Sequence, residues 1–429
     1  MRDITIIGAG QAGLQLGIGL LTHGYRVTLV TDRTAEQIRD GRIMSSQCMF
    51  GTALAHEHNL GLNLWDRDCP PVEGISFVVP DGRGGTAISW ASRLDAAARS
   101  VDQRVKMPAW LAEFERRGGR IELREADVTD LESYARESDL VIVAAGKGRI
   151  AGLFERDAQR STFDRPQRAL ALTYVTGMTP RDEYSAVAFN LIPGVGEYFT
   201  FPALTTTGPC DIMVFEGVPG GPLDCWADVD STEEHVERSL RILRTHLPWE
   251  AERCADVAPT DANGVLAGRF PPTVRRPVGQ LPSGALVLGM ADVVVLNDPI
   301  TGQGSNNASK CAASYLASIL EHGERPFDGA FLQGTFERYW DYAQYVAAWT
   351  NAMLGAPPEH VLELLGAAGG DSRIAHRFAN GFDDPRDFFH WFMDPDAARV
   401  YLDAAAVSAG TVEAVRTGGV PAATVGSSA

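Results

Sequence analysis

The chain opens with Ile4-Thr5-Ile6-Ile7, followed directly by Gly8-Ala9-Gly10-Gln11-Ala12-Gly13 and then by an apolar helical pattern to Leu21. A buried strand, a G-x-G-x-x-G turn and a helix form the βα unit that binds a dinucleotide pyrophosphate. The first two glycines allow a tight turn and a close backbone approach, and the third lets the helix pack on the strand. The helix N-terminus offers free N–H groups and a positive dipole end to the phosphates. We therefore expect a cofactor at Gly8, Gly10, Gln11, Ala12 and Gly13.

A second predicted strand, Arg26-Val27-Thr28-Leu29-Val30, leads into the adenosine end of the same site. It ends at Thr31-Asp32-Arg33, where Asp32 lies about 20 residues after the glycines, the usual place of an acidic residue that binds the ribose 2′-OH. Arg33 leaves open a contact to the 2′-phosphate of NADP. We expect Thr31, Asp32 and Arg33 to contact the adenosine of the cofactor.

A second motif near residue 290 favours FAD. Leu286 to Ala291 reads as a buried strand that runs into Asp292, and residues 298–308 lead into a helical pattern that continues to Leu320. This resembles the second fingerprint of flavoprotein hydroxylases, with residues 139–146 as their middle strand. The resemblance implies that Asp292 holds the ribityl chain and that a Pro-x-x-G-Q-G turn sets a helix N-terminus against the isoalloxazine. It adds these residues to the cofactor-binding set: Ala145, Gly146, Asp292, Pro299, Gly302, Gln303, Gly304 and Asn306.

Composition agrees with an enzyme that works in water. The 429 residues are 45% hydrophobic and 22% charged, which is enough for one large core or two fused cores. The net charge of −17 makes nucleic acid and anionic membranes poor partners. The six cysteines contain no C-x-x-C motif, and no secretory leader or membrane-length apolar run is apparent, so we expect a cytoplasmic protein with reduced thiols.

The predicted fold class is α/β, a Rossmann-like FAD-binding domain of the flavoprotein hydroxylase (glutathione-reductase-like) type. We assign residues 1–65, 96–150 and 265–340 to this discontinuous domain. Between Ala169 and Glu216, short apolar runs broken by Gly and Pro predict an antiparallel sheet, so residues 66–95 and 151–264 are expected to form an inserted substrate-binding β-sheet domain. Residues 341–408 are expected to be C-terminal helices, and 409–429 a frayed tail.

The whole chain resembles the oxygenase component of the two-component styrene and indole monooxygenases, FAD-dependent epoxidases supplied by a separate flavin reductase. Beyond the two cofactor motifs, Gly41-Arg42 and Arg165 to Leu170 match segments of that family. The resemblance implies that Arg42 lies near the flavin, and we place Arg99 with it among the cofactor-binding residues. It also implies that the cofactor arrives as FADH2 from an NADH-dependent reductase, because the chain has only one G-x-G-x-x-G fingerprint.

Six positions separate the two branches of this family. Where styrene enzymes carry Asn, Val, His, Tyr, His and Ser, indole enzymes carry Ser, Gln, Met, two aliphatic residues and Ala. This chain follows the indole pattern, with Ser45, Gln47, Met49, Val72, Ile75 and Ala98 as predicted substrate-binding residues. The hydroxyl and amide could bind an indole N–H, and the other four side chains suit a flat bicycle.

The resemblance implies that reduced FAD and O2 form a C4a-hydroperoxide that needs no protein nucleophile. We found no Ser-His-Asp set, no paired carboxylates and no metal cluster, and His56 and His58 are read as a solvated helix face. The expected activity is epoxidation of indole at its 2,3 bond, leading to indoxyl and indigo. The alternatives are styrene epoxidation with sulfide oxidation as a side activity, a single-component NAD(P)H-dependent aromatic hydroxylase, and a non-catalytic flavin carrier. The expected partners are the reductase, O2 and a small aromatic alkene or heteroaromatic; the oligomeric state stays open, a homodimer included.

Overall fold

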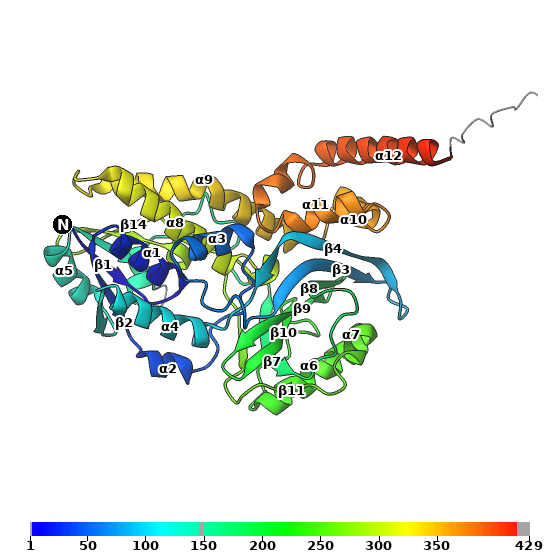
Figure 1. The fold of residues 1–429 in the computed structure, drawn as a ribbon, viewed down its shortest axis with the longest axis horizontal. Coiled ribbons are helices and arrows are strands. Elements are labelled where there is room, and N and C mark those ends of the chain that lie inside the picture. Colours follow the sequence, from blue (N-terminus) through cyan, green and yellow to red (C-terminus); the bar gives the residue numbers. More distant parts are fainter. Residues whose placement is uncertain (1, 146–148, 418–429) are drawn as a thin grey trace, which may run out of the picture.

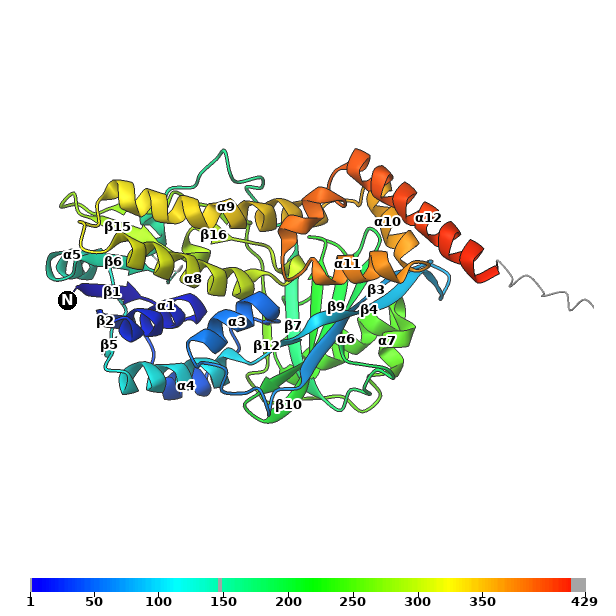
Figure 2. The ribbon, with the colours of Figure 1, turned by 45° about the horizontal axis from the view of Figure 1, so that its top comes forward.

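The structure is a computed structural model that describes residues 2–145 and 149–417. Figures 1 and 2 show two β-sheets side by side, with helices on their outer faces and a final group of helices at the far end of the second sheet. The predicted α/β fold class is confirmed: one mostly parallel sheet carries the N-terminal βα unit, and one mostly antiparallel sheet is inserted into it.

The first sheet has six strands in the order β14-β15-β6-β1-β2-β5. Neighbouring strands are parallel except for the pair β14 and β15. The strands are β1 (Asp3–Ile7), β2 (Arg26–Thr31), β5 (Arg120–Leu123), β6 (Leu140–Val143), β14 (Val278–Gln280) and β15 (Leu286–Gly289). Because β1, β2, β6 and β15 run in one direction, the loops after them meet at one edge, where open α/β sheets bind their ligands.

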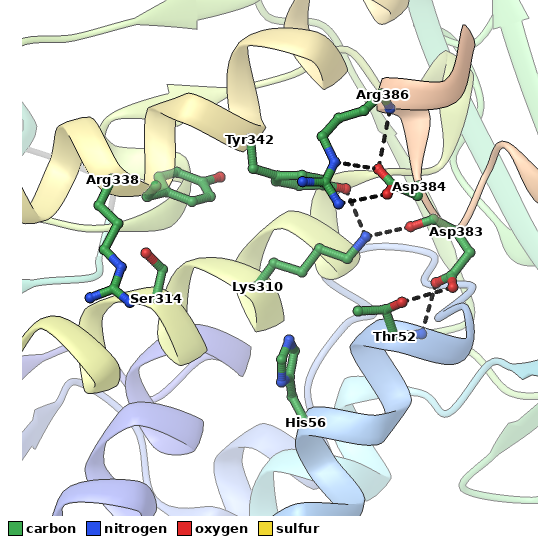
Figure 3. Close-up of a pocket in the computed structure, with 10 residues that line it drawn as sticks. Thr52, His56, Lys310, Ser314, Arg338, Tyr342, Asp383, Asp384 and Arg386 are labelled. Atoms are coloured by element: carbon green, nitrogen blue, oxygen red, sulfur yellow. Dashed lines mark hydrogen bonds and ion pairs between the residues drawn. The ribbon is translucent and has the colours of Figure 1, made fainter.

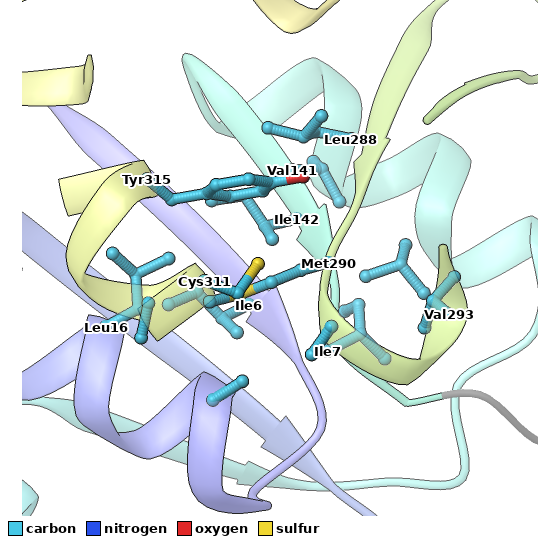
Figure 4. Close-up of a cluster of buried hydrophobic side chains, with 14 of the residues drawn as sticks. Ile6, Ile7, Leu16, Val141, Ile142, Leu288, Met290, Val293, Cys311 and Tyr315 are labelled. Carbon is cyan, nitrogen blue, oxygen red and sulfur yellow. The ribbon is translucent and has the colours of Figure 1, made fainter. Parts of the chain in front are cut away.

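Helices cover both faces of this sheet, which explains why β1 and β6 are almost continuously apolar. The side chains of Ile6, Ile142, Leu288, Cys311 and Tyr315 interlock between the sheet and its helices (Figure 4). The helices are α1 (Gln11–Thr22), α2 (Ala35–Arg39), α3 (Gly51–Asn59), α4 (Gln103–Arg116), α5 (Val128–Glu137), α8 (Gly304–His322) and α9 (Gly329–Met353). Three short 3-10 helices and one two-stranded sheet complete this region. The 3-10 helices are η1 (Arg149–Leu153), η2 (Ala291–Val293) and η3 (Pro299–Thr301), and the small sheet pairs β13 (Thr273–Val274) with β16 (Val295–Leu296).

The second sheet has the strand order β11-β7-β10-β9-β8-β3-β4, and β12 also pairs with β7. All its pairs are antiparallel except β3 with β8. The strands are β3 (Pro71–Pro80), β4 (Thr86–Arg99), β7 (Ala169–Thr176), β8 (Ala186–Ile192), β9 (Gly196–Thr205), β10 (Gly208–Gly217), β11 (Ala258–Pro259) and β12 (Val265–Gly268). The four short strands expected between Ala169 and Glu216 are therefore present.

Helices lie against both faces of the second sheet. On one side, α6 (Thr232–His246) and α7 (Pro248–Glu252) pack on a cluster that includes Phe215 and Trp226. On the other side, Trp349 of α9 and Phe378 and Phe388 of the C-terminal helices pack in one hydrophobic cluster with the sheet. These helices are α10 (Glu359–Ala368), α11 (Ser372–Asn380), η4 (Pro385–His390) and α12 (Pro395–Thr417). Helix α9 runs along the molecule and joins the two regions (Figure 2).

The expected division into domains stays a proposal. Strand β4 continues to Arg99, so the second sheet extends into the stretch that begins at residue 96 and was expected to belong to the FAD-binding domain. Over the described ranges, no helix combines the length and the apolar character that a membrane span requires.

Candidate active site

The turn between β1 and α1 has the geometry of a pyrophosphate site. Gly8 has φ of +117°, and a Cβ there would lie 2.8 Å from the Ala145 amide nitrogen. A Cβ on Gly13 would overlap the carbonyl oxygen of Gly8. Gly10 is different: it is exposed, and a Cβ would meet no atom within 4 Å. Helix α1 starts there without a side-chain cap, so its first N–H groups face open space and fit a bound phosphate.

Other predicted cofactor residues lie at the same edge of the first sheet, where β2, β6 and β15 end. Asp32, at the end of β2, has 61% of its side chain exposed and lies 3.6 Å from the Arg33 guanidinium. Asp292 is exposed after β15, and the residue before it, Ala291, has φ of +52°, a backbone strain often found at binding sites. Thr31 is buried and Ala145 is half-buried. Gly146 lies outside the described residues. The exposed carboxylates and the open glycine fit an extended dinucleotide along this edge.

The loop before α8 supplies a second open helix N-terminus. Asp298 caps η3 by accepting a hydrogen bond from the Ile300 N–H at 3.1 Å. After the half-buried Pro299, the chain turns at Gly302, with φ of +64°, and enters α8 without a side-chain cap at exposed Gly304. Gln303 points inward and donates to the Phe382 carbonyl oxygen at 3.0 Å. An open helix N-terminus here suits the negative charge of a reduced flavin.

An apolar cavity adjoins this loop. Its wall is made by alternate residues 46, 48 and 50, by strands β8 and β9 and by the loop itself: Ser46, Cys48, Phe50, Val187, Phe189, Phe199, Phe201, Thr301 and Gly302. The volume of about 20 Å³ is close to what one water occupies, so a substrate enters only if side chains move. Its apolar lining and its position beside the loop 298–304, which we call the flavin loop, make it the candidate substrate pocket.

Three of the predicted substrate residues lie on the same segment as the cavity wall but do not line the cavity. Gln47 donates a hydrogen bond to the Val101 carbonyl oxygen. Ser45 bonds the side chains of Gln47 and Gln103 at 3.2 and 2.9 Å. The Met49 sulfur lies 3.1 Å from the Lys106 ammonium.

The other three predicted substrate residues are also outside the lining. Val72 and Ala98 face each other across β3 and β4, and both are fully buried with Ile75. All three belong to the hydrophobic cluster that also contains Cys48 and Phe50. The structure therefore brings them close to the cavity wall, and the role of the six residues in specificity stays a prediction.

A buried ion pair beneath the cofactor turn was not anticipated. Lys106 and Glu57 pair with both side chains inside the protein. Gln11 joins them, accepting from Lys106 at 3.2 Å and donating to Glu57 at 2.9 Å, so its side chain points away from the phosphate position. Ala12 is buried in the hydrophobic core beside it. Single charged residues on separate helices carry no sequence signal of such a pair.

The two predicted cofactor arginines differ in their surroundings. Arg42 is exposed in the segment after α2. Arg99 is partly buried, donates to the Cys69 carbonyl oxygen at 2.6 Å and lies 3.8 Å from Asp66. Contact of either guanidinium with the flavin stays a prediction.

A group of carboxylates lies behind the flavin loop. Glu197 accepts two hydrogen bonds from Arg168, at 2.7 and 2.8 Å. Glu216, its neighbour on β10, is 0% exposed, and neither of its oxygens has a partner among the described residues. Burial raises the pKa of Glu216 well above its usual range, and the nearby Asp298 carboxylate adds to the effect. The uncharged form of the Glu216 carboxyl is therefore favoured in the folded protein.

The sequence is similar to known flavin enzymes. Residues 146–253 match the family model of the styrene monooxygenase A putative substrate binding domain. Styrene monooxygenase StyA of Pseudomonas fluorescens is 30% identical over 406 residues, covering 92% of this chain and 96% of that protein. StyA from another Pseudomonas shows the same identity and coverage.

Solved structures show the same fold at low sequence identity. The flavin-dependent brominase Bmp2 aligns with a TM-score of 0.60 at 13% identity, over 94% of this chain and 99% of the brominase. PqsL of P. aeruginosa, solved with 2-aminobenzoylacetate, aligns with a TM-score of 0.58 at 16% identity, over 87% of this chain and 98% of PqsL. These structures support the fold alone, whereas the identity to StyA extends over nearly the full length of both chains. The chain therefore belongs to the StyA family of flavin-dependent monooxygenases.

Proposed function

We propose that this protein epoxidises a small, apolar aryl alkene with FAD that a separate reductase has reduced. The observation that carries the proposal is the apolar cavity at Thr301 and Gly302, beside the open N-terminus of α8. Both StyA relatives are named for styrene, a substrate without polar atoms. A cavity walled mainly by Phe, Val and Cys side chains suits such a molecule.

The residues at the sheet edge have distinct tasks in this proposal. Gly10 and the first turn of α1 would bind the FAD pyrophosphate, Asp32 the adenosine ribose and Asp292 the ribityl chain. The N-terminus of α8 would stabilise negative charge on the reduced ring. When bound in its reduced form, FAD supplies the activation of O2. Phe50, Phe199 and their neighbours would hold the aryl ring and exclude water.

Indole is the second candidate substrate. Ser45, Gln47, Met49, Val72, Ile75 and Ala98 follow the pattern of indole enzymes. Two hydroxyl groups, of Ser46 and Thr301, line the cavity, although the Thr301 hydroxyl already bonds that of Thr350 at 2.6 Å. A hydroxyl that accepts the indole N–H would favour indole over styrene, because a polar contact made in the pocket discriminates strongly. The product would then be the 2,3-epoxide, which leads to indoxyl and indigo.

Product analysis tests the reaction. The purified chain, a general FAD reductase, NADH and air are supplied with styrene and with indole in parallel. We expect styrene oxide as the main product and indigo as the lesser one. If indigo predominates, indole is the substrate of choice; if NADH is consumed and neither product forms, the epoxidase proposal is wrong.

A matched pair of variants tests the pocket. Phe201 lines the cavity, whereas Phe215 packs in the cluster on the opposite face of the same sheet. We expect Phe201→Leu to change the styrene-to-indole ratio of kcat/KM, and Phe215→Leu to lower stability while keeping that ratio. If the styrene-to-indole ratio of kcat/KM is the same in both variants, the substrate does not bind in this cavity.

The source of electrons is tested without oxygen. In the proposed two-component reaction, anaerobic NADH or NADPH leaves the FAD-loaded chain oxidised until the reductase is added. Bleaching of the flavin by the isolated chain would identify a single-component hydroxylase instead.

A further inference from the structure

The segment that carries Arg42 is held in place by a loop of the second sheet. Loop 260–264 joins β11 to β12, and its residue Asn263 bonds the backbone on both sides of Arg42. The Asn263 side chain donates to the Asp40 carbonyl oxygen at 2.9 Å, and the Asn263 carbonyl oxygen accepts from the Ile43 N–H at 3.1 Å. One residue therefore fixes the path of the chain through Arg42.

Loop 260–264 is fixed in turn by β7. The Tyr174 carbonyl oxygen accepts from the Thr260 N–H at 3.1 Å, and the Tyr174 N–H donates to the Gly264 carbonyl oxygen at 2.9 Å. The Tyr174 hydroxyl also donates to the Ser45 carbonyl oxygen at 3.1 Å, in the segment after α2. The second sheet therefore holds both ends of the loop and the segment that the loop supports.

A buried ion pair fixes the middle of the loop. The Asp261 carboxylate accepts hydrogen bonds from the Asn263 N–H at 2.8 Å and from the Arg104 guanidinium at 2.8 and 3.0 Å. Arg104, on α4, is 2% exposed and also donates to Asp102 at 2.9 Å. Burial opposes ionisation of Asp261, but the hydrogen bonds from Arg104 and Asn263 hold its pKa below the usual value, so it stays a carboxylate. The orientation of Asn263 is therefore tied to a buried residue of α4.

Arg42 itself has no partner among the residues that the structure describes. Its side chain is exposed, and the guanidinium makes no hydrogen bond or ion pair within residues 2–145 and 149–417. A guanidinium on a fixed backbone can bind an anion at little cost in order, because its donors match carboxylate and phosphate oxygens.

The charged groups around another cavity show the contrast. This cavity of about 180 Å³ lies between α3, α8, α9 and the start of η4 (Figure 3). The Lys310 ammonium points toward Asp383 and donates to its carbonyl oxygen at 2.5 Å. The Arg386 guanidinium donates to the Asp384 carboxylate at 2.8 and 2.6 Å. These cations already have acceptors inside the protein, whereas Arg42 needs one from outside.

The segment of Arg42 runs between the two ends of the proposed cofactor site. Two positions after Arg42, the Met44 sulfur lies 2.9 Å from the Arg33 guanidinium at the adenosine end. Four positions after Arg42, Ser46 lines the apolar cavity beside the flavin loop. FAD carries a pyrophosphate and, once reduced, a negatively charged ring, so it brings acceptors to this path.

We propose that Asn263 is a positioning residue that holds the Arg42 guanidinium in place to bind FAD. The inference rests on the proposed function for the place of FAD, but not on the identity of the substrate. Without the Asn263 side chain, the Asp40 carbonyl oxygen turns to water and the Arg42 segment gains freedom. Part of the binding free energy must then order the segment, so FAD binds less tightly.

A double-mutant cycle on FAD affinity tests the proposal. FAD is titrated into the purified chain without oxygen, once oxidised and once reduced by dithionite. We expect Arg42→Ala to weaken binding in at least one redox state by about tenfold, the scale of a hydrogen bond to a charged group. Asn263→Ala should weaken it by about threefold, and the double variant should bind like Arg42→Ala within about twofold. If the two losses multiply in the double variant, Asn263 does not act through Arg42 and the proposal is wrong.

Kinetics separate positioning from a general loss of structure. Asn263→Ala should raise the concentration of reduced FAD that gives half-maximal turnover and leave kcat at saturating FAD unchanged, because the affected step is binding. A fall in kcat with unchanged affinity would overturn the assignment.

Asn380→Ala is the matched control. The Asn380 amide accepts from the Asp95 N–H at 2.8 Å and donates to the His376 carbonyl oxygen at 3.0 Å, on β4 and α11. Figure 2 shows these elements away from the first sheet. The control variant should lose stability and bind FAD as wild type does; a loss of affinity equal to that of Asn263→Ala would contradict the proposal.

Gly10→Val distinguishes failure of this proposal from failure of the cofactor site. If Gly10→Val abolishes FAD binding while Arg42→Ala binds FAD as wild type does, the site stands and the roles of Arg42 and Asn263 are wrong. If Gly10→Val binds FAD as wild type does, the cofactor site is misplaced and the proposal falls with it.

Discussion

Asn306 in the first turns of α8 hydrogen-bonds to the backbone N–H of Phe50, which lines the apolar cavity, at 2.9 Å. The same side-chain amide donates to the carbonyl oxygen of Cys48 at 2.8 Å, so both groups of one amide hold the cavity segment. The helix that begins at the flavin loop and the wall of the proposed substrate pocket are therefore joined by one buried side chain.

Asn306→Ala should lower both stability and turnover, because it leaves the Phe50 N–H and the Cys48 carbonyl unpaired. Each such loss costs about 1–3 kcal/mol. Asn307→Ala is the control: Asn307 is similarly buried, but its amide has no partner among the described residues. Denaturant unfolding and kcat measure the difference, and equal losses in the two variants would remove Asn306 from this role.

Gly10→Val and Gly13→Val should fail in different ways. Gly10 has φ of −85° and open space at its Cβ position, so valine should leave the stability of the FAD-free protein within about 0.5 kcal/mol. The same valine would occupy the position of the pyrophosphate and abolish FAD binding. At Gly13 a Cβ meets the Gly8 carbonyl, so the fold itself should be destabilised. Tm without FAD and flavin titration separate the two effects; tight FAD binding by Gly10→Val would show that the site is misplaced.

Exchange of Ser45→Asn, Gln47→Val and Met49→His tests the six-residue specificity pattern. We expect the triple variant to shift preference toward styrene by moving the backbone of residues 46–50, since the three side chains lie outside the cavity lining. It should also lose about 1–3 kcal/mol of stability, because the Val101 carbonyl loses the Gln47 amide. A styrene-to-indole ratio of kcat/KM that stays within about twofold, roughly 0.4 kcal/mol, would contradict a role of these residues in specificity.

The buried Glu216 carboxyl should make stability depend on pH. Its pKa is raised in the folded protein, so above the unfolded pKa of about 4.3 the folded state binds more protons than the unfolded state. The contribution of the Glu216 carboxyl to the free energy of unfolding is therefore fully present below that pH and is lost as the pH rises. Glu216→Gln keeps the size and shape of the side chain but has no group that titrates. The Tm of the variant should therefore fall less than that of wild type between pH 5 and pH 9, a range of about four units. Parallel Tm curves for the two proteins would show that Glu216 does not titrate in this range.

The order of residues along the chain determined the cofactor turn. Gly8, Gly10 and Gly13 need no distant partner to specify a strand, a tight turn and a helix, because their effect is local backbone geometry. The apolar runs broken by Gly and Pro between Ala169 and Glu216 are equally local, and they predicted the four strands β7 to β10 without fixing all of their ends.

Tertiary structure alone decided which side of the segment 45–50 meets the apolar cavity. Alternation shows that residues 45, 47 and 49 face away from 46, 48 and 50, but it does not say which set faces the cavity. The apolar Cys48 and Phe50 belong to the set that lines the cavity, and the part of either set in substrate specificity stays a prediction. The Lys106–Glu57 pair and the cavity around Lys310 were also beyond prediction from sequence, because each is assembled from helices that are far apart in the chain. Periodicity assigns residues to faces of an element, and only packing between elements determines what each face contacts.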